Sequence, residues 1–254
     1  MVSRGRSAGV GPNGKREELE FRLTVGLRIM TSLLTKTLPS LVLLTVVMGL
    51  LLFVPAGTTQ YREAWVYLAI FAGASLLTSL YLLQRDPALL QRRMRGGPMA
   101  EKETTQKIIM LFASIGFIAL LVVPSLDHRF GWSRVPVPVE IAGDLLVVIG
   151  FYFIFRVYKE NSFTSATIEV AENQSVISTG PYALVRHPMY ASSMLYIIGT
   201  PLALGSYWGL LAIVFMMPFL IWRLFDEERF LANNLPGYRE YQKKVQHRLL
   251  PYIW

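Results

Sequence analysis

The sequence predicts an all-α protein: a multi-pass bundle of about six apolar helices that cross a membrane and end in a helical hairpin with a polar tail. Of its 254 residues, 53% are hydrophobic and only 17% are charged, whereas about a quarter of a soluble domain is charged. The apolar residues form blocks close to the ~20 residues that a helix needs to cross a bilayer. The basic residues are concentrated in every second loop, which is typical of a membrane protein.

The apolar blocks give the order of the helices. They are expected over residues 38–55, 64–83, 108–124, 139–157, 188–204 and 207–225. Only Gly205 and Ser206 separate the last two blocks, which therefore predict an antiparallel hairpin. Both blocks are short, so a tilted or partly sunken pair is as compatible with the sequence as two full spans.

The chain divides into three predicted parts: a polar tail with an interfacial helix over 1–36, four transmembrane helices over 37–157, and a region over 158–254 that carries the chemistry. Residues 1–16 are polar and are expected to be disordered. Apolar residues at helical spacing from Leu19 to Leu34 predict an amphipathic helix lying on the membrane. A plain extension of the first span explains the same spacing equally well.

The basic residues predict the orientation in the membrane. Every second loop, on one side of the predicted bundle, holds nearly all of them. The loops on the opposite side hold only Arg62, Arg129 and Arg134. Because the positive side stays in the cytoplasm, both termini are expected there, at the inner membrane if the source is bacterial. The net charge of +8 then indicates contact with anionic membrane lipids and not with nucleic acid.

Polar and aromatic residues near the outer ends of the helices need no functional explanation. Trp65 and Trp208 fit an aromatic belt at the membrane surface. The outer loop over 125–138 is expected to be an ordinary polar loop, not a metal or catalytic site. Asp144 lies one turn inside the fourth span and is expected to extend back to the interface.

Two cytoplasmic segments, 161–190 and 223–254, contain the candidate functional residues. The first leads into the hairpin and the second leaves it, so a short outer turn brings their inner ends together. We therefore expect two groups to face each other: Arg186, His187 and Tyr190 on one side, and Arg223, Glu227 and Glu228 on the other.

His187 stands directly before Pro188, a residue that favours the first turn of a helix. The free N–H groups of such a turn attract carboxylates, and Arg186 adds a fixed charge. A capped helix with an arginine extended to the interface accounts for the same residues without function.

The second group lies on the continuation of the last helix. Arg223 and Glu227 are spaced i,i+4 and can form a pair, while Glu228 points about 100° away from Glu227. One carboxylate is then available for a cationic group of a ligand. A solvated charged helix face is the alternative interpretation.

These motifs resemble the isoprenylcysteine carboxyl methyltransferase and phospholipid methyltransferase family. The family pattern RHPxYxG is matched by RHPMY from Arg186 to Tyr190, with Ser192 in place of the glycine. The pattern EExxL is matched by Glu227, Glu228 and Leu231, and a Gly-Tyr pair follows at Gly237 and Tyr238. The resemblance covers roughly the last 95 residues.

The resemblance implies an integral membrane methyltransferase that uses S-adenosylmethionine (SAM). It implies that His187, Tyr190, Glu227 and Glu228 contact the cofactor, with Tyr182 as a weaker candidate. SAM carries an ammonium, a sulfonium and a ribose diol, which suit carboxylates, and a carboxylate that suits the start of a helix. Methyl transfer depends mainly on positioning, and the chain has neither a cysteine nucleophile nor a recognisable metal site.

The acceptor is expected to be lipid-like: a hydrophobic small molecule or a lipidated group that enters from the membrane. No obvious general base exists among His128, His187 and His247, which slightly favours a carboxylate acceptor over an amine or a thiol. Arg186 or Arg223 would steer that carboxylate and are the catalytic candidates. Two other functions are compatible with the sequence: an NADPH-dependent membrane reductase of the sterol-reductase type, and a non-catalytic membrane protein of the same fold.

Overall fold

The computed structural model describes the backbone of residues 12–254 and the side chains of residues 31–254. Over this part the chain is helical and contains no strand, which confirms the predicted all-α class. Its elements are α1 (Pro12–Ala56), α2 (Arg62–Arg85), α3 (Pro87–Met94), η1 (Pro98–Ala100), α4 (Thr104–Phe130), α5 (Val137–Glu160), η2 (Gly180–Ala183), α6 (Pro188–Ala203), α7 (Leu210–Asn234) and α8 (Tyr238–Lys244).

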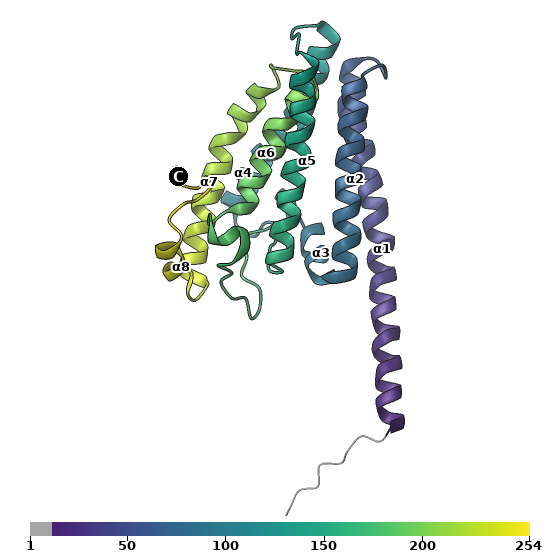
Figure 1. Ribbon diagram of the computed structural model, residues 1–254, viewed down its shortest axis with the longest axis vertical. Helices are drawn as coiled ribbons and strands as arrows, with labels where there is room; N and C mark the ends of the chain where they lie inside the picture. Colours follow the sequence, from purple (N-terminus) through teal and green to yellow (C-terminus); the bar gives the residue numbers. More distant parts are fainter. Residues whose placement is uncertain (1–11) are drawn as a thin grey trace, which may run out of the picture.

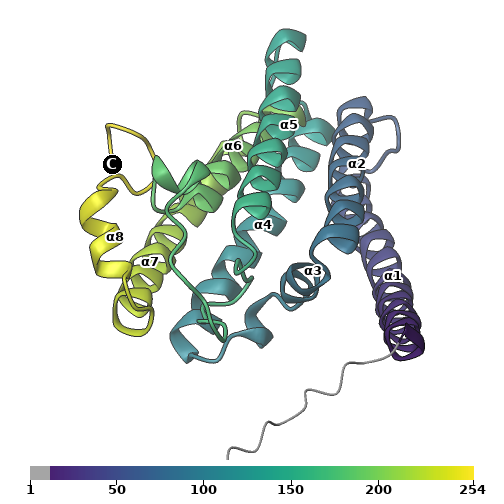
Figure 2. The same cartoon turned by 60° about the horizontal axis from the view of Figure 1, so that its bottom comes forward.

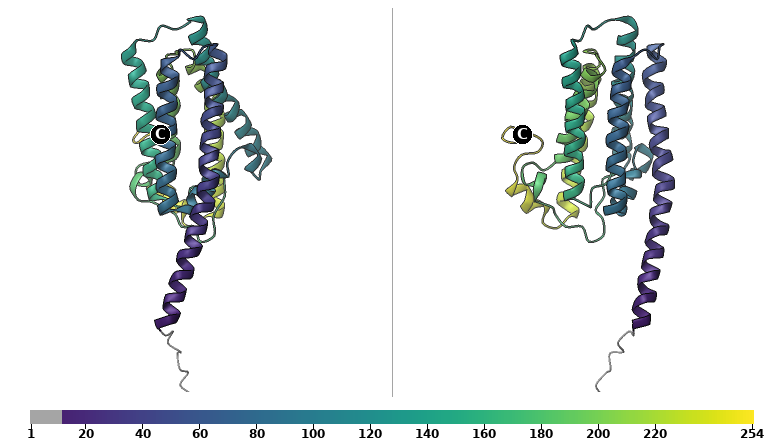
Figure 3. Two further views of the ribbon diagram at one scale, coloured as in Figure 1. Left: turned by 90° about the vertical axis from the view of Figure 1, so that its right-hand side faces the viewer. Right: turned by 45° about the vertical axis from the view of Figure 1, so that its right-hand side comes forward.

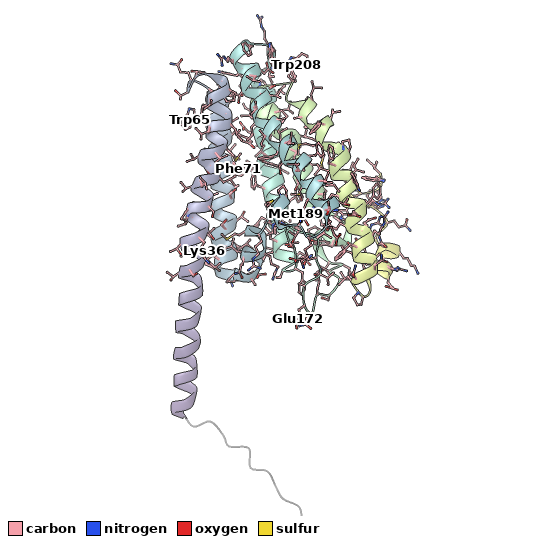
Figure 4. All side chains as sticks on the ribbon, turned by 180° about the vertical axis from the view of Figure 1, so that it is seen from behind. Lys36, Trp65, Phe71, Glu172, Met189 and Trp208 are labelled. Carbon is pink, nitrogen blue, oxygen red and sulfur yellow. The ribbon has the colours of Figure 1, made fainter. Side chains whose placement is uncertain are left out.

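The long helices run side by side and alternate in direction (Figure 1). One end of the bundle carries the links α1–α2, α4–α5 and α6–α7. The other end carries α3, α8 and the loop between α5 and α6, which come forward in Figure 2. Trp65 and Trp208 lie near the first end and Glu172 lies at the opposite end (Figure 4). The loops rich in basic residues thus share one end, as the charge pattern requires.

Within the described residues, four helical segments are long and apolar enough to cross a membrane: Thr31–Ala56, Arg62–Arg85, Thr104–Phe130 and Val137–Glu160. They indicate an integral membrane protein. Helix α6 has only 16 residues, fewer than the ~20 of a full span. The structure therefore has the six predicted apolar helices. The last two, α6 and α7, are not among the four helical segments of membrane-spanning length and composition.

Helix α1 continues without interruption from Pro12 through the first span and extends beyond the bundle (Figure 3). Of the predicted disordered tail, residues 1–11 lie outside the described part of the chain, whereas residues 12–16 are helical. The side chains of the predicted interfacial helix lie outside the described residues as far as position 30. Its backbone is one helix with the first span.

The third apolar helix does not end at Pro124, as the sequence suggests. Helix α4 continues to Phe130 and ends where Gly131 adopts a left-handed conformation, with φ of 65°. Asp127 is consequently buried, and its carboxylate accepts hydrogen bonds from Ser133 and Ser206. The predicted polar loop over 125–138 shortens to residues 131–136. Asp127 lies in the last turns of α4 and closes the end of the bundle that carries the α4–α5 link.

The predicted hairpin differs from the structure in its packing. Six residues, 204–209, link α6 to α7. Helix α6 packs along α5 and α7 packs along α4, and the two make little contact with each other. Glycines permit the first pairing: a side-chain carbon at Gly150 would lie 2.8 Å from the backbone nitrogen of Tyr196, and one at Gly199 would lie 2.7 Å from the carbonyl oxygen of Gly143. Space therefore remains between α6 and α7.

Candidate functional site

A cavity of about 560 Å³ lies between α4, α6 and α7, and the loop over residues 161–178 also lines it. Its volume falls within the ~300–1,000 Å³ typical of small-molecule sites. Tyr190, Arg223 and Glu227 line the part near the basic end of the bundle. Between the same helices, the cavity extends to apolar side chains such as Phe117 of α4 and Ile197 of α6. The site thus has a polar end and an apolar end.

Glu227 is held by the first turn of α6. The hydroxyl of Tyr190 donates a hydrogen bond to Oε2 of Glu227 over 2.7 Å. Pro188 begins α6 and sets this turn, and Tyr190 stands two residues later. Among the described residues no other hydrogen bond or ion pair to the Glu227 carboxylate occurs, so this carboxylate retains lone pairs that face the cavity.

Glu228 has a different environment, since three cationic or potentially cationic side chains surround it. Nε of Arg186 lies 2.8 Å from Oε1 of Glu228, and Nε2 of His187 lies 3.1 Å from the same oxygen. Nε of Arg248 donates to Oε2 over 3.1 Å. Although burial raises the pKa of Glu228, its hydrogen bonds and these charges outweigh that effect and lower the pKa to about 2.

The last segment of the chain completes this cluster. The backbone N–H of Arg186 donates to the carbonyl of His247 over 2.9 Å, and that of His187 donates to the carbonyl of Arg248 over 3.0 Å. The N–H groups expected to be free at the start of α6 are thus partly used. Those of Met189 and Tyr190 have no acceptor within the described part of the chain.

Arg223 is not paired with Glu227 in the way the i,i+4 spacing predicts. Its Nη2 lies 2.7 Å from Oε1 of Glu101, and its Nη1 donates to Oε1 of Gln106 over 2.7 Å. Nη2 also donates to the carbonyl of Ala166 over 3.0 Å. Helix α7 is thereby joined to the start of α4 and to the loop that lines the cavity.

Tyr182 lies in η2 and lines the cavity. Asn161 donates to its hydroxyl over 3.0 Å, and its backbone carbonyl accepts from Tyr241 over 2.7 Å. Burial raises the pKa of Tyr182, so its phenol stays neutral. It connects the end of α5 with α8 and closes one side of the site.

Ser192, the departure from the family pattern, points away from the cavity. Its hydroxyl donates to the carbonyl of Pro188 over 2.6 Å, and its own carbonyl faces Gly150 of α5. The serine in place of the family's glycine therefore lies at the contact between α5 and α6 and not on the cavity wall. Ser193, its neighbour, lines the cavity instead.

The structure brings all seven of the predicted site residues to one end of the bundle and adds three that the sequence did not reveal: Glu101, Gln106 and Arg248. Glu101 is the one acidic residue between the basic positions Arg95 and Lys102, a signal that was available. Arg248 stands in a tail rich in basic residues, where nothing distinguishes it from its neighbours.

The model of the phospholipid methyltransferase family matches residues 139–236. The cobalt-zinc-cadmium resistance protein CzcN of Cupriavidus metallidurans is 27% identical over 137 residues, which cover 46% of this chain and 62% of that protein. The chain thus matches less than two thirds of the length of this relative.

The matched segment runs from α5 to the end of α7 and contains Arg186, His187, Tyr190 and both glutamates. Methyltransferases of this family act in membranes and generally use SAM. The predicted family resemblance is therefore confirmed for this segment: residues 139–236 are similar to the phospholipid methyltransferase family.

Proposed function

We propose that the chain is an integral membrane methyltransferase that transfers a methyl group from SAM to a lipid-like acceptor. The observation that carries the proposal is the two-ended cavity: a polar end formed by the RHPMY turn and Glu227, continuous with an apolar end between the membrane-type helix α4 and the apolar helices α6 and α7. The family match supports the reaction class, and the basic end of the bundle is then the cytoplasmic side.

The residues of the polar end fit the chemistry of the cofactor. The Glu227 carboxylate suits an ammonium group, and the unpaired N–H groups of Met189 and Tyr190 suit a carboxylate. His187 and Tyr182 also line the cavity and suit the neutral polar groups of the cofactor. When bound, SAM supplies an electrophilic methyl group. The residues of the site then bind and orient SAM and the acceptor, and they exclude water.

Glu228 differs from Glu227 in this proposal. Because Arg186, His187 and Arg248 already neutralise it, its main contribution is to hold the first turn of α6 against the C-terminal segment. Its contact with the cofactor, implied by the resemblance, would then be the smaller of the two.

The acceptor would enter along the apolar end, which is lined by α4, α6 and α7. His187, the only histidine on the cavity wall within the described residues, is engaged by Glu228. A carboxylate acceptor needs no general base, so we favour it slightly over an amine or a thiol. Arg223 and Arg186 line the cavity and supply fixed positive charge, which steers such an acceptor although both are ion-paired.

Ligand binding and product formation test the proposal. S-adenosylhomocysteine (SAH) should raise the melting temperature of the purified protein, and NADPH should not. The protein should also transfer labelled methyl groups from SAM to a component of a membrane lipid extract. Stabilisation by NADPH alone would favour a reductase, and binding of neither would favour a non-catalytic membrane protein.

A further inference from the structure

Glu101, Gln106 and Arg223 form a buried polar cluster beside the cavity. Their exposed fractions are 4%, 2% and 7%. Glu101 follows η1, and Gln106 lies in the first turn of α4, so both come from outside the segment 139–236 that matches the family. A buried ion pair of this kind is costly unless its geometry and its hydrogen bonds are good, and here both terminal nitrogens of Arg223 have partners.

Arg223 lies within reach of a second carboxylate. Glu227 follows it by four residues on α7, the spacing at which side chains of a helix meet, and the charges of the two groups interact. Nevertheless the ion pair forms with Glu101, at 2.7 Å, and Glu227 accepts its hydrogen bond from Tyr190. Two carboxylates thus compete for one guanidinium, and Glu101 holds it.

We propose that Glu101 is a positioning residue that keeps Arg223 away from Glu227, so that the Glu227 carboxylate stays available for the cationic group of the cofactor. This role rests on the proposed function. Without the Glu101 charge, Arg223 would be a buried cation with a neutral partner, and the carboxylate of Glu227 lies one helical turn away on α7. An ion pair between them would neutralise the group that binds the ligand.

The same carboxylate also fixes the loop over the cavity. The N–H of Ile168 donates to Oε2 of Glu101 over 3.4 Å, and the carbonyl of Ala166 accepts from Arg223. Both loop residues line the cavity. In Glu101→Gln the amide oxygen can still accept the hydrogen bond from Ile168, so the loop contact does not depend on the Glu101 charge. That charge therefore acts on the cofactor site through the guanidinium of Arg223.

Titration of the purified full-length protein with SAH tests this role, using Glu101→Gln, Arg223→Gln and the double variant. Glu101→Gln should weaken SAH binding about tenfold or more, because an interaction with a charged partner is lost. The double variant should recover affinity to within about threefold of the wild type, since no guanidinium is left to occupy Glu227. Glu103→Gln is the matched control: Glu103 is exposed, two residues away, and should behave as the wild type.

A merely structural role of Glu101 predicts the opposite for the double variant, which would bind SAH no better than Glu101→Gln. That result, or unchanged affinity in Glu101→Gln, would overturn the inference. Glu101→Asp, which keeps the charge, should bind more tightly than Glu101→Gln and covers the case in which the glutamine variant fails to fold. If the wild type itself binds no SAH, the proposed function fails and this role with it, whereas wild-type binding without an effect of Glu101→Gln rejects this role alone.

Discussion

The hydroxyl of Tyr190 lies 2.7 Å from Oε2 of Glu227, and this contact joins the start of α6 to the part of α7 near the basic end of the bundle. The two helices otherwise make little contact along their length. The pair therefore connects two walls of the cavity, and it fixes the direction of a carboxylate that has no other partner among the described residues.

Tyr190→Phe should weaken SAH binding by about tenfold or more, because a hydrogen bond to a charged group contributes roughly 1.5–3 kcal/mol and about 1.4 kcal/mol is tenfold in affinity. The fold should persist, since the ring remains. Isothermal titration with SAH measures the change. Tyr152→Phe removes a hydroxyl from an exposed site on α5 and should leave the affinity unaltered. An equal loss in both variants would contradict a specific role for Tyr190.

Glu228 should make stability depend on pH in the acidic range. Its pKa is lowered from its usual 4.5 to about 2 by the groups around it. A carboxyl group with a depressed pKa contributes stability that is complete above its unfolded value and is lost as the pH falls through the folded value. The melting temperature should therefore decrease between pH 4.5 and pH 2.

Glu228→Gln should flatten this dependence and lower the melting temperature at neutral pH, because Arg186 and Arg248 lose their charged partner. Melting curves recorded across the acidic range make the comparison. Glu240→Gln alters an exposed carboxylate of α8 and should keep the wild-type profile. A Glu228→Gln profile as steep as that of the wild type would mean that another group controls acid unfolding.

The α5–α6 contact should tolerate no side chain at Gly150. An added carbon there would lie 2.8 Å from the backbone nitrogen of Tyr196, so Gly150→Ala forces the helices apart and should cost about 1–3 kcal/mol. Gly73→Ala is the control, since nothing lies within 4 Å of the added carbon. It should be neutral or stabilising by up to about 1 kcal/mol. Melting temperatures in detergent distinguish the two, and similar values would argue against close helix packing.

The apolar end of the cavity should govern the acceptor and not the cofactor. Ala113 of α4 lines this end, so Ala113→Phe should raise KM for a hydrophobic acceptor about tenfold or more while leaving SAH affinity within about twofold. Ile115→Phe places the same ring on the exposed side of the same helix and should change neither value. A loss of SAH binding in Ala113→Phe would show that the two ends are not separate.

The positions of the apolar helices could be read from the sequence because length and hydropathy are local properties. The end of α4 could not, since a proline at position 124 interrupts a hydrogen bond without ending this helix. The short helices α3 and α8 were also missed. Their Leu89 and Tyr241 are buried against distant segments, which no local pattern reports.

For the site, the sequence alone determined which residues gather at one end of the bundle: the RHPMY turn and the glutamate pair follow from motif order and from a short link between two helices. Only the tertiary structure decided how they are paired. In the structure, Glu228 pairs with Arg186, His187 and Arg248. Glu227 accepts a hydrogen bond from Tyr190, and Arg223 forms an ion pair with Glu101. The physical reason is that a buried charge takes the partner that packing brings to it, and Glu101 lies 122 positions from Arg223 in the chain.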